Sequence, residues 1–299
     1  MTGTAGPDAE RSARPDPGPD LRPVAVERRT AGSGPRVLLL HGLAANDTVW
    51  DAVLPALPAD FQLWTARLPW RTETVADGFG AGFGDDGLRA PLAEALAAVP
   101  GGPEVVVAHS MAANVLLDLL AGPGADGDAP GRGGIRALVL VSPFYRRRAD
   151  EFDWDTISYY LNDFHLIMEE GIRAHSGDRI PADLRRAMGE RVRDRVGPYG
   201  WFRFFDLYLR TPALATDRIT LPTLVLAGGT DFAARPGEAV ALAAALPDAR
   251  CLVLPGSGHF PMLDAAQRFA AAVSDFVHTT PGLPAPRGRA LPEALELQR

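Results

Sequence analysis

Three residues that lie far apart in the chain, Ser110, Asp231 and His259, have the side chains needed for nucleophilic chemistry. A serine hydroxyl is a weak nucleophile and needs a neighbouring base to take its proton. A histidine can be that base, and a carboxylate bonded to the imidazole fixes its tautomer and stabilises the imidazolium ion that forms. If the fold brings the three side chains together, we expect nucleophilic attack on a carbonyl carbon.

The sequence around Ser110 favours a nucleophile held at a sharp turn. Residues 105–107 are three valines, typical of a buried strand, and residues 114–120 have the broad apolar face of a helix. Alanine stands two places before and two places after Ser110, and only small residues fit beside such a strand-to-helix turn. Because glycine is the common residue at both places, a serine in an ordinary turn remains an alternative.

Position along the chain selects His259 and Asp231 as partners of Ser110. His259 follows the apolar run 251–254 in a loop of small residues, where it can overhang the same edge of a sheet as the serine. Asp231 ends the segment 224–231, one strand earlier, so the chain order is serine, acid, histidine. The alternative role for Asp231 is a helix N-cap, because aspartate is favoured there.

The remaining histidines and acids fit these roles less well. His41 and His109 lie inside tight turns, where we expect them to brace the backbone. Two rival acids, Asp150 and Glu151, follow the strand expected to end at residue 141 but lie well into the expected cap. No pair of histidines has the spacing of metal ligands with an intervening carboxylate, so we do not expect a zinc site. A reaction carried by Ser110, His259 and Asp231 needs neither a metal nor an organic cofactor, and we expect none.

Strands that alternate with helices predict a mostly parallel sheet covered by helices on both faces, an α/β architecture. The expected strands are at 24–26, 37–40, 62–66, 105–107, 137–141, 223–226 and 251–254. The expected helices of this part are at 48–57, 88–99, 114–120, 237–246 and 265–277. In such a sheet the nucleophile, acid and base are all expected at the carboxyl ends of strands.

Residues 143–211 interrupt this alternation. They are expected to form three helices, at 155–175, 181–196 and 199–209, and the block holds 13 of the 23 aromatic residues. We expect a helical cap over the carboxyl edge of the sheet, with most of these rings in the cap's own core and the rest around a substrate. The residues expected to bind substrate are Trp70, Phe144, Tyr145, Trp154, Tyr160, Phe164, Phe205 and Phe260.

The expected organisation is one core with an inserted cap. Residues 1–23 are rich in Pro, Gly, Asp and Arg, so we expect them to be disordered. The core comprises residues 24–142 plus 212–279, the cap 143–211, and a tail 280–299, in which residues 292–297 could form a helical turn.

Composition and charge exclude several classes of protein. A net charge of −7 gives no attraction to nucleic acid or an anionic membrane. The first residues lack the apolar core of a signal peptide, and the sequence has no apolar run of about 18 residues, so we expect no membrane span and a cytoplasmic protein. The single cysteine, Cys251, rules out an internal disulfide. The glycine-rich run 78–84 follows no clear strand and no Lys-Ser or Lys-Thr pair follows it, so we do not expect it to bind phosphate.

Four short motifs, in this order and spacing, resemble the α/β-hydrolase fold superfamily and in particular its capped single-domain members. They are His-Gly at 41–42, Ala-His-Ser-Met-Ala at 108–112, Gly-Gly-Thr-Asp at 228–231 and Gly-Ser-Gly-His at 256–259. The resemblance covers about residues 24–277. It implies that the backbone N–H groups of Leu43 and Met111 form an oxyanion hole.

One segment departs from that family's pattern. After the strand near Trp64, relatives usually carry an aspartate and a Gly-x-Gly turn, whereas this chain has Ala-Arg-Leu-Pro-Trp-Arg at 66–71. The segment is expected to border the mouth of the site, so the departure weakens inference of the substrate from relatives but does not affect the expected triad.

The function that the residues and the resemblance predict is hydrolysis of a hydrophobic carboxylic ester or thioester by a serine hydrolase. Three alternatives stay open: acyl transfer or elimination on the same fold in a natural-product pathway, and a small-molecule receptor without activity. The expected partner is a small hydrophobic acyl substrate. The arginine run 146–148 is expected to be a solvated turn paired with nearby acids, or else to steer an anionic substrate or an acyl-carrier protein.

Overall fold

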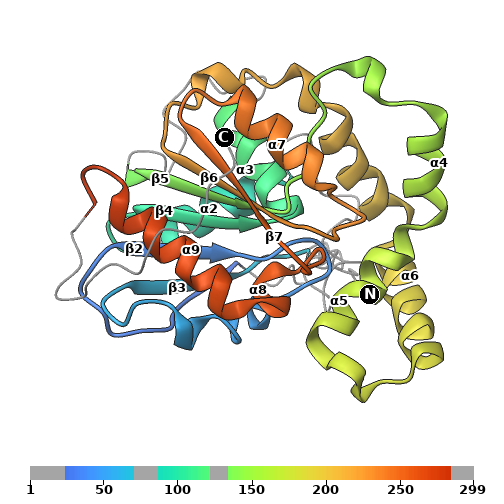
Figure 1. Cartoon of the computed structure of the whole chain (residues 1–299), viewed down its shortest axis with the longest axis horizontal. Helices are drawn as coiled ribbons and strands as arrows, with labels where there is room; N and C mark the ends of the chain where they lie inside the picture. The colour runs from blue at the N-terminus through green and yellow to red at the C-terminus, as the bar shows by residue number, and fades with distance from the viewer. Residues whose placement is uncertain (1–23, 71–86, 122–133, 284–299) are drawn as a thin grey trace, which may run out of the picture.

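A seven-stranded sheet runs through the middle of the protein (Figure 1). The computed structural model describes residues 24–70, 87–121 and 134–283. The strand order is β1-β3-β2-β4-β5-β6-β7, and all neighbours are parallel except β1, which is antiparallel to β3. The strands are β1 (Ala25–Arg28), β2 (Arg36–Leu40), β3 (Gln62–Arg67), β4 (Val105–His109), β5 (Ala137–Val141), β6 (Thr223–Gly228) and β7 (Ala249–Leu254).

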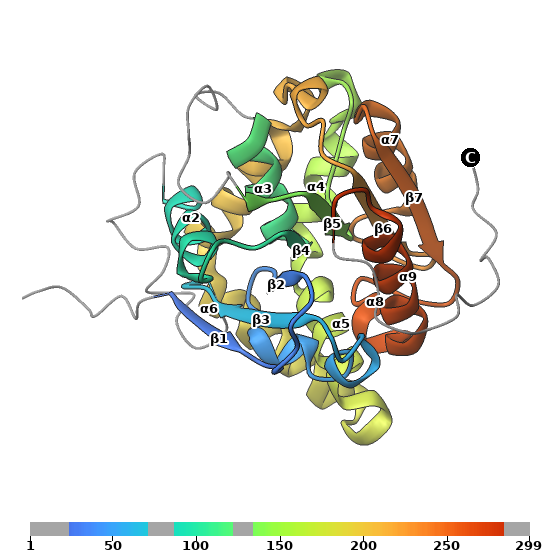
Figure 2. The same ribbon diagram turned by 90° about the vertical axis from the view of Figure 1, so that its left-hand side faces the viewer.

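Each central strand is apolar on both sides because helices cover both faces of the sheet. Leu38 and Leu40 of β2 face one core, together with α2 (Arg89–Ala98), α3 (Met111–Ala121) and α7 (Pro236–Ala245). Val37 and Leu39 face the other core, with α8 (Pro261–Asp264) and α9 (Ala266–Thr279). The two helical layers lie on opposite sides of the sheet in Figure 2. The architecture confirms the predicted α/β-hydrolase fold.

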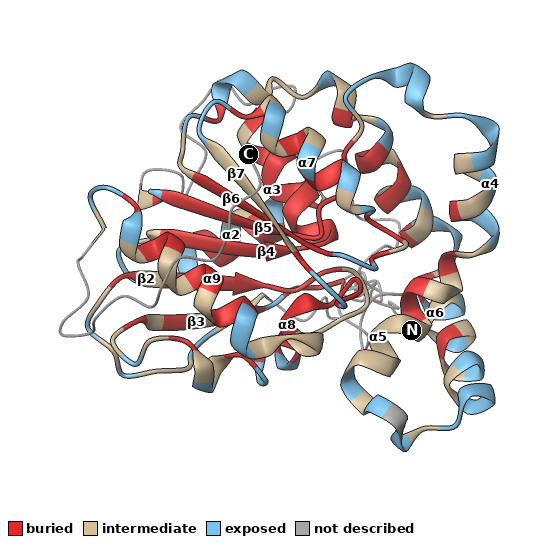
Figure 3. Cartoon of the chain, viewed as in Figure 1, coloured by how far each residue is buried: buried red, intermediate tan, exposed pale blue. Residues whose placement is uncertain are grey.

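Helices α4 (Trp154–Asn162), α5 (Phe164–Ser176) and α6 (Ala182–Leu209) gather at one end of the sheet (Figure 1). Their outward surfaces are exposed, whereas the strands beside them are buried (Figure 3). The single helix predicted at 155–175 is wrong, because the chain breaks at Asp163, whose φ of −106° and ψ of 11° are not helical. The predicted division near residue 197 is present within α6, where Gly197 takes a φ of 64° before Pro198.

The helix predicted at 48–57 is also wrong. Two short 3₁₀ helices replace it, and Pro55 lies in the second of them, where it has no N–H to donate to an α-helix. The 3₁₀ helices are Asp47–Trp50, Leu54–Ala56, Ala149–Glu151, Gly177–Arg179, Thr211–Ala213 and Thr216–Arg218. The predictions for residues 1–23, 78–84 and 292–297 lie outside the described residues.

Candidate active site

Ser110 occupies the turn between β4 and α3, with a backbone φ of 54°. This left-handed conformation is costly for a residue with a side chain, and the surrounding contacts must hold it. The amide of Ser110 donates to the carbonyl of Val141 on β5 at 2.8 Å. Ala108 and Ala112 are completely buried beside the turn. The small residues that flank Ser110 in the sequence are therefore needed for close packing.

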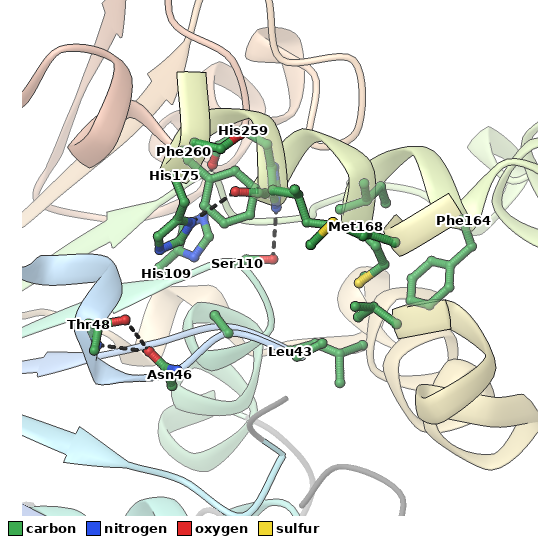
Figure 4. A pocket seen from close by; sticks show the side chains of 18 of the residues that line it. Leu43, Asn46, Thr48, His109, Ser110, Phe164, Met168, His175, His259 and Phe260 are labelled. Carbon is green, nitrogen blue, oxygen red and sulfur yellow. Dashed lines mark hydrogen bonds between the residues drawn. The ribbon is translucent and has the colours of Figure 1, made fainter. Parts of the chain in front are cut away.

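The side chains of Ser110, His259 and Asp231 form a continuous hydrogen-bonded chain. Nε2 of His259 lies 3.0 Å from Oγ of Ser110 (Figure 4), and Nδ1 lies 2.9 Å from Oδ2 of Asp231. When Nδ1 carries the proton and donates to the carboxylate, the lone pair of Nε2 faces the serine hydroxyl. The arrangement can take a proton from Ser110 and stabilise the resulting imidazolium ion.

Asp231 is held by two further hydrogen bonds. Its Oδ1 accepts from the amides of Ala233 and Ala234 at 2.9 and 3.0 Å, which leaves Oδ2 for His259. The alternative role of the residue as a backbone cap is thus partly present, although α7 begins only at Pro236. One oxygen of the carboxylate binds the backbone amides and the other binds His259. The turn at residues 231–234 therefore fixes the orientation of the Asp231 carboxylate relative to the imidazole.

His41 and His109 brace the backbone, as the sequence suggested. Nε2 of His41 accepts from the amide of Leu68 at 3.0 Å, while Nδ1 donates to the carbonyl of Gly42 at 2.8 Å. Nε2 of His109 donates to the carbonyl of His259 at 2.9 Å. Burial, together with the neighbouring imidazole of His259, holds the pKa of His109 well below 6.5, so this ring is neutral. His109 thereby supports the main chain of His259.

The backbone near Ser110 also includes the two amides expected to bind an oxyanion. Met111 is the first residue of α3, and the first amides of a helix have no partner inside it. Leu43 follows Gly42, where an added Cβ would lie only 2.9 Å from the Cβ of Ser110. This close approach brings the loop after β2 against the serine.

Ser110 opens into a cavity of about 430 Å³ beneath α5 and α6 (Figure 4). The cavity has the size of an ordinary small-molecule site. Most of its wall is apolar, and His259 and Ser110 both reach it. The residues on α5 that line it are Phe164, Ile167, Met168, Gly171, Ile172, His175 and Ser176.

Three of the eight predicted substrate-binding residues, Phe144, Phe164 and Phe260, line this cavity. Its lining includes none of the other five, which are Trp70, Tyr145, Trp154, Tyr160 and Phe205. Trp154 points away from the protein and is 81% exposed.

The other four rings pack elsewhere for identifiable reasons. Tyr160 donates to the carbonyl of Ala233 at 2.7 Å, and Phe205 stacks on Trp201 at 5.0 Å between ring centroids. Trp70 and Tyr145 are buried in the main core. Most cap rings thus fill the cap and its junction with the sheet.

Sequence reasoning missed several aliphatic residues of the cavity wall. The α5 residues recur at intervals of three and four, the pattern of one helix face. Met188 and Val192 on α6 continue the wall with the same spacing of four. This periodicity is present in the sequence, whereas the prediction of substrate contacts depended on aromatic residues alone.

Other groups with possible chemical roles are occupied or inert. Burial raises the pKa of the Cys251 thiol to about 11, which keeps it protonated. Within the described ranges, no cluster of three or more His, Cys, Asp or Glu side chains is placed to hold a metal ion.

No helix among the described residues is long and apolar enough to cross a membrane.

The three residues of the arginine run 146–148 all form hydrogen bonds or ion pairs. Nε of Arg146 donates to the hydroxyl of Tyr208 at 2.8 Å, and the guanidinium of Arg148 pairs with Asp150. The amide of Arg147 donates to Glu151 at 3.3 Å. The pairing with neighbouring acids expected for this turn thus holds for the Arg148 side chain, whereas Arg146 points inward to Tyr208 and Glu238.

Comparison with known proteins gives sequence and structural relatives. A pimeloyl-[acyl-carrier protein] methyl ester esterase from Nitrosomonas europaea is 26% identical over 267 residues, which cover 83% of this chain and 98% of that protein. An esterase from Thermogutta terrifontis has a TM-score of 0.56 at 22% identity, covering 86% of this chain and 93% of the other. A bromoperoxidase from Bacillus anthracis has a TM-score of 0.58 at 18% identity, covering 85% and 94%.

The two solved structures share the fold but differ in named activity, so the fold alone does not identify the reaction. The sequence profile described as the Alpha/beta hydrolase family matches residues 37–272, a range that contains Ser110, Asp231 and His259. The chain belongs to the alpha/beta hydrolase family.

Proposed function

We propose that this protein is a serine hydrolase that cleaves a hydrophobic carboxylic ester or thioester through an acyl-enzyme. The observation that carries the proposal is the 3.0 Å contact between Oγ of Ser110 and Nε2 of His259 at the mouth of an apolar cavity. A hydroxyl with a base in reach, next to space for a hydrophobic chain, suits acyl transfer to serine.

In the proposed reaction, Ser110 attacks the carbonyl carbon while His259 takes the hydroxyl proton. Asp231 keeps the imidazole in the required tautomer, and the amides of Leu43 and Met111 bind the oxyanion. His259 then gives the proton to the departing alcohol or thiol. Water, activated by the same imidazole, releases the acid and restores Ser110.

The two ends of the cavity differ, which suggests how the substrate lies. On α5, a Cβ at Gly171 would lie 3.0 Å from Cζ of Phe260, the residue after His259, so Gly171 is the point of α5 that lies beside the catalytic histidine. From there to Phe164 the helix rises roughly 10 Å along an apolar wall. We assign the acyl chain to this end, where Met168 and Phe164 lie beyond Ser110 in Figure 4.

The opposite end is polar. His175 follows Gly171 by one helical turn, and Asn46 lines the same part of the wall (Figure 4). Oδ1 of Asn46 accepts from the amide of Thr48 at 3.0 Å, which holds this polar side chain in place beside the cavity. We assign the alcohol or thiol part of the substrate to this end.

An acyl group carried on an acyl-carrier protein is the finer form of the proposal. Its support is the name of the Nitrosomonas relative, an esterase of a pimeloyl-[acyl-carrier protein] methyl ester. The pairing of Arg146 and Arg148 with other residues gives no support for docking of a carrier at that turn. The carrier proposal therefore rests on the relative and on the long apolar cavity.

A fluorophosphonate probe tests the nucleophile. Wild type should be labelled and Ser110→Ala should not. Ser142→Ala is the matched control, because Ser142 is also buried, follows the neighbouring strand β5 and has a φ of 47°. Labelling that persists in Ser110→Ala, or is lost in Ser142→Ala as well, contradicts the assignment.

Product analysis tests the reaction. Acyl esters and acyl thioesters of increasing chain length are incubated with the protein in isotopically labelled water. Free acid that contains the labelled oxygen supports hydrolysis. An alkene, or an acyl group transferred to another acceptor, refutes hydrolysis and supports elimination or acyl transfer on the same fold.

A further inference from the structure

A charged cluster joins the cap to the loop that carries His259. Nη2 of Arg173, on α5, donates to Oδ1 of Asp264 on α8 at 2.8 Å. The same guanidinium donates to both oxygens of Glu170, at 2.7 Å from Nε and 2.8 Å from Nη2. Oδ2 of Asp264 accepts from the amide of Gly258 at 2.8 Å. We call Glu170, Arg173 and Asp264 the Arg173 cluster.

Helix α5 also packs directly on both residues that flank His259. A Cβ at Gly258 would lie 2.3 Å from Oε1 of Glu170, so the carboxylate lies directly against the backbone of this glycine. On the other flank, Phe260 fits against the bare backbone of Gly171, where a Cβ would be 3.0 Å from its ring. The cap helix therefore contacts the main chain immediately before His259 and the side chain immediately after it.

The carboxylates of the cluster are largely buried, although the Arg173 side chain itself is 39% exposed. The side chains of Glu170 and Asp264 are only 13% and 11% exposed, and both lie against the loop at Gly258. Arg173 is the cation that neutralises both, and its planar fork can bind two acceptors at once. Without it, two poorly solvated carboxylates repel each other beside Gly258, and the hydrogen bond that the Gly258 amide donates to Asp264 is weakened.

We propose that Arg173 is a positioning residue for His259, acting through Asp264 and the amide of Gly258. The catalytic part of this proposal rests on the proposed function. If Arg173 positions His259, then His259 contacts Ser110 in the reactive geometry only while α5 is packed over the cavity. The cap thus serves both to line the acyl site and to complete the base.

Kinetics of Arg173→Met test the positioning role. Since a displacement of about 1 Å can cost on the order of a hundredfold in rate, we expect kcat to fall at least about tenfold with KM changed by less than about threefold. Arg173→Lys keeps the charge but not the fork, so it should recover part of the loss. Asp264→Asn should lower kcat as well, and the double variant should lose no more than the worse single variant.

The matched control is Arg185→Met. Arg185 of α6 pairs with Glu169 of α5 at 3.4 Å, an ion pair within the cap that does not reach the His259 loop. Its kcat should stay within about twofold of wild type. An unchanged kcat in Arg173→Met, or an equal loss in Arg185→Met, overturns the proposal. If Arg173→Met does not fold, Arg173→Lys and Asp264→Asn carry the same comparison.

Hydrogen exchange of the Gly258 amide tests the contact independently of any substrate. Loss of the Arg173 cluster should speed exchange of this amide at least about tenfold in Arg173→Met and leave it unchanged in Arg185→Met. Failure of the fluorophosphonate to label wild type refutes the serine hydrolase but not the link from Arg173 to the loop. Equal Gly258 exchange in wild type and Arg173→Met refutes the link whatever the activity.

Discussion

Replacement of Glu238 by glutamine should remove a pH dependence of stability that the buried carboxyl creates. Glu238 lies on α7 and is 4% exposed. Its Oε1 accepts from the hydroxyl of Tyr208 at 2.9 Å, and its Oε2 accepts from the amide of Tyr145 at 2.9 Å. Nη2 of Arg146 lies 3.5 Å away. The carboxyl thus connects the core to the last turns of α6 and the start of the cap.

Burial raises the pKa of Glu238 from 4.5 to about 7, although the hydrogen bond from Tyr145 and the charge of Arg146 partly oppose this shift. Between these values the folded state holds more protons than the unfolded state. The free energy of unfolding must therefore fall as the pH rises from 4.5 to about 7, and then level off. At 1.36 kcal/mol per pKa unit, the total loss is about 3 kcal/mol.

Urea unfolding of wild type and Glu238→Gln at about pH 5 and about pH 8 measures this effect. Glutamine does not ionise, so wild type should lose roughly 2 to 3 kcal/mol more than the variant between the two conditions. Glu190→Gln is the control for net charge, because the Glu190 side chain is 43% exposed on α6 and pairs only with Arg186 among the described residues. Equal pH dependence in wild type and Glu238→Gln would refute the reasoning.

Three further predictions concern the site and its cavity. Asp231→Asn keeps an oxygen for the amides of Ala233 and Ala234 but presents an NH₂ group to Nδ1 of His259. In steady-state assays kcat should therefore fall on the order of 10⁴-fold, while the thermal midpoint changes little. Gly42→Ala places a Cβ 2.9 Å from the Cβ of Ser110, so calorimetry should show a destabilisation of about 1 to 3 kcal/mol, together with slower fluorophosphonate labelling. Phe164→Ala should lower kcat/KM for long acyl esters about tenfold or more and for acetyl esters much less, whereas Trp154→Ala, at a ring that is 81% exposed, should change neither.

The sheet was predictable because its signals are local. Each central strand is a short apolar run bounded by turn residues, as at 37–40 and 137–141, and both runs are strands in the structure. Ser110, Asp231 and His259 each directly follow such a run or the turn after it, so the parallel order brings them to one edge. The predictions of helices at 48–57 and 155–175 are wrong because a single residue changes the backbone in each. Pro55 prevents an α-helix in the first segment, and Asp163 divides the second into two helices.

The substrate residues were less predictable because an aromatic ring suits several environments. Tyr160, Phe205 and Phe164 all lie on cap helices, yet only Phe164 lines the cavity. The difference depends on how α4, α5 and α6 are rotated about their axes, which is set by tertiary packing. Trp154 lies at the exposed start of α4, so its ring remains in solvent although it is large and apolar.

The polar contacts that anchor the cap could not be inferred from the sequence at all. In the sequence, Arg173 and Glu170 form an ordinary helix-surface pair, and Asp264 is 91 residues away from Arg173. In the structure this pair reaches the loop before His259, while Tyr160 of α4 donates to Ala233, whose amide binds Asp231. The cap is thus attached to both the acid loop and the base loop. Any substitution meant to widen the cavity by moving α4 or α5 should therefore be judged by the Asp231–His259 contact as well as by the space it creates.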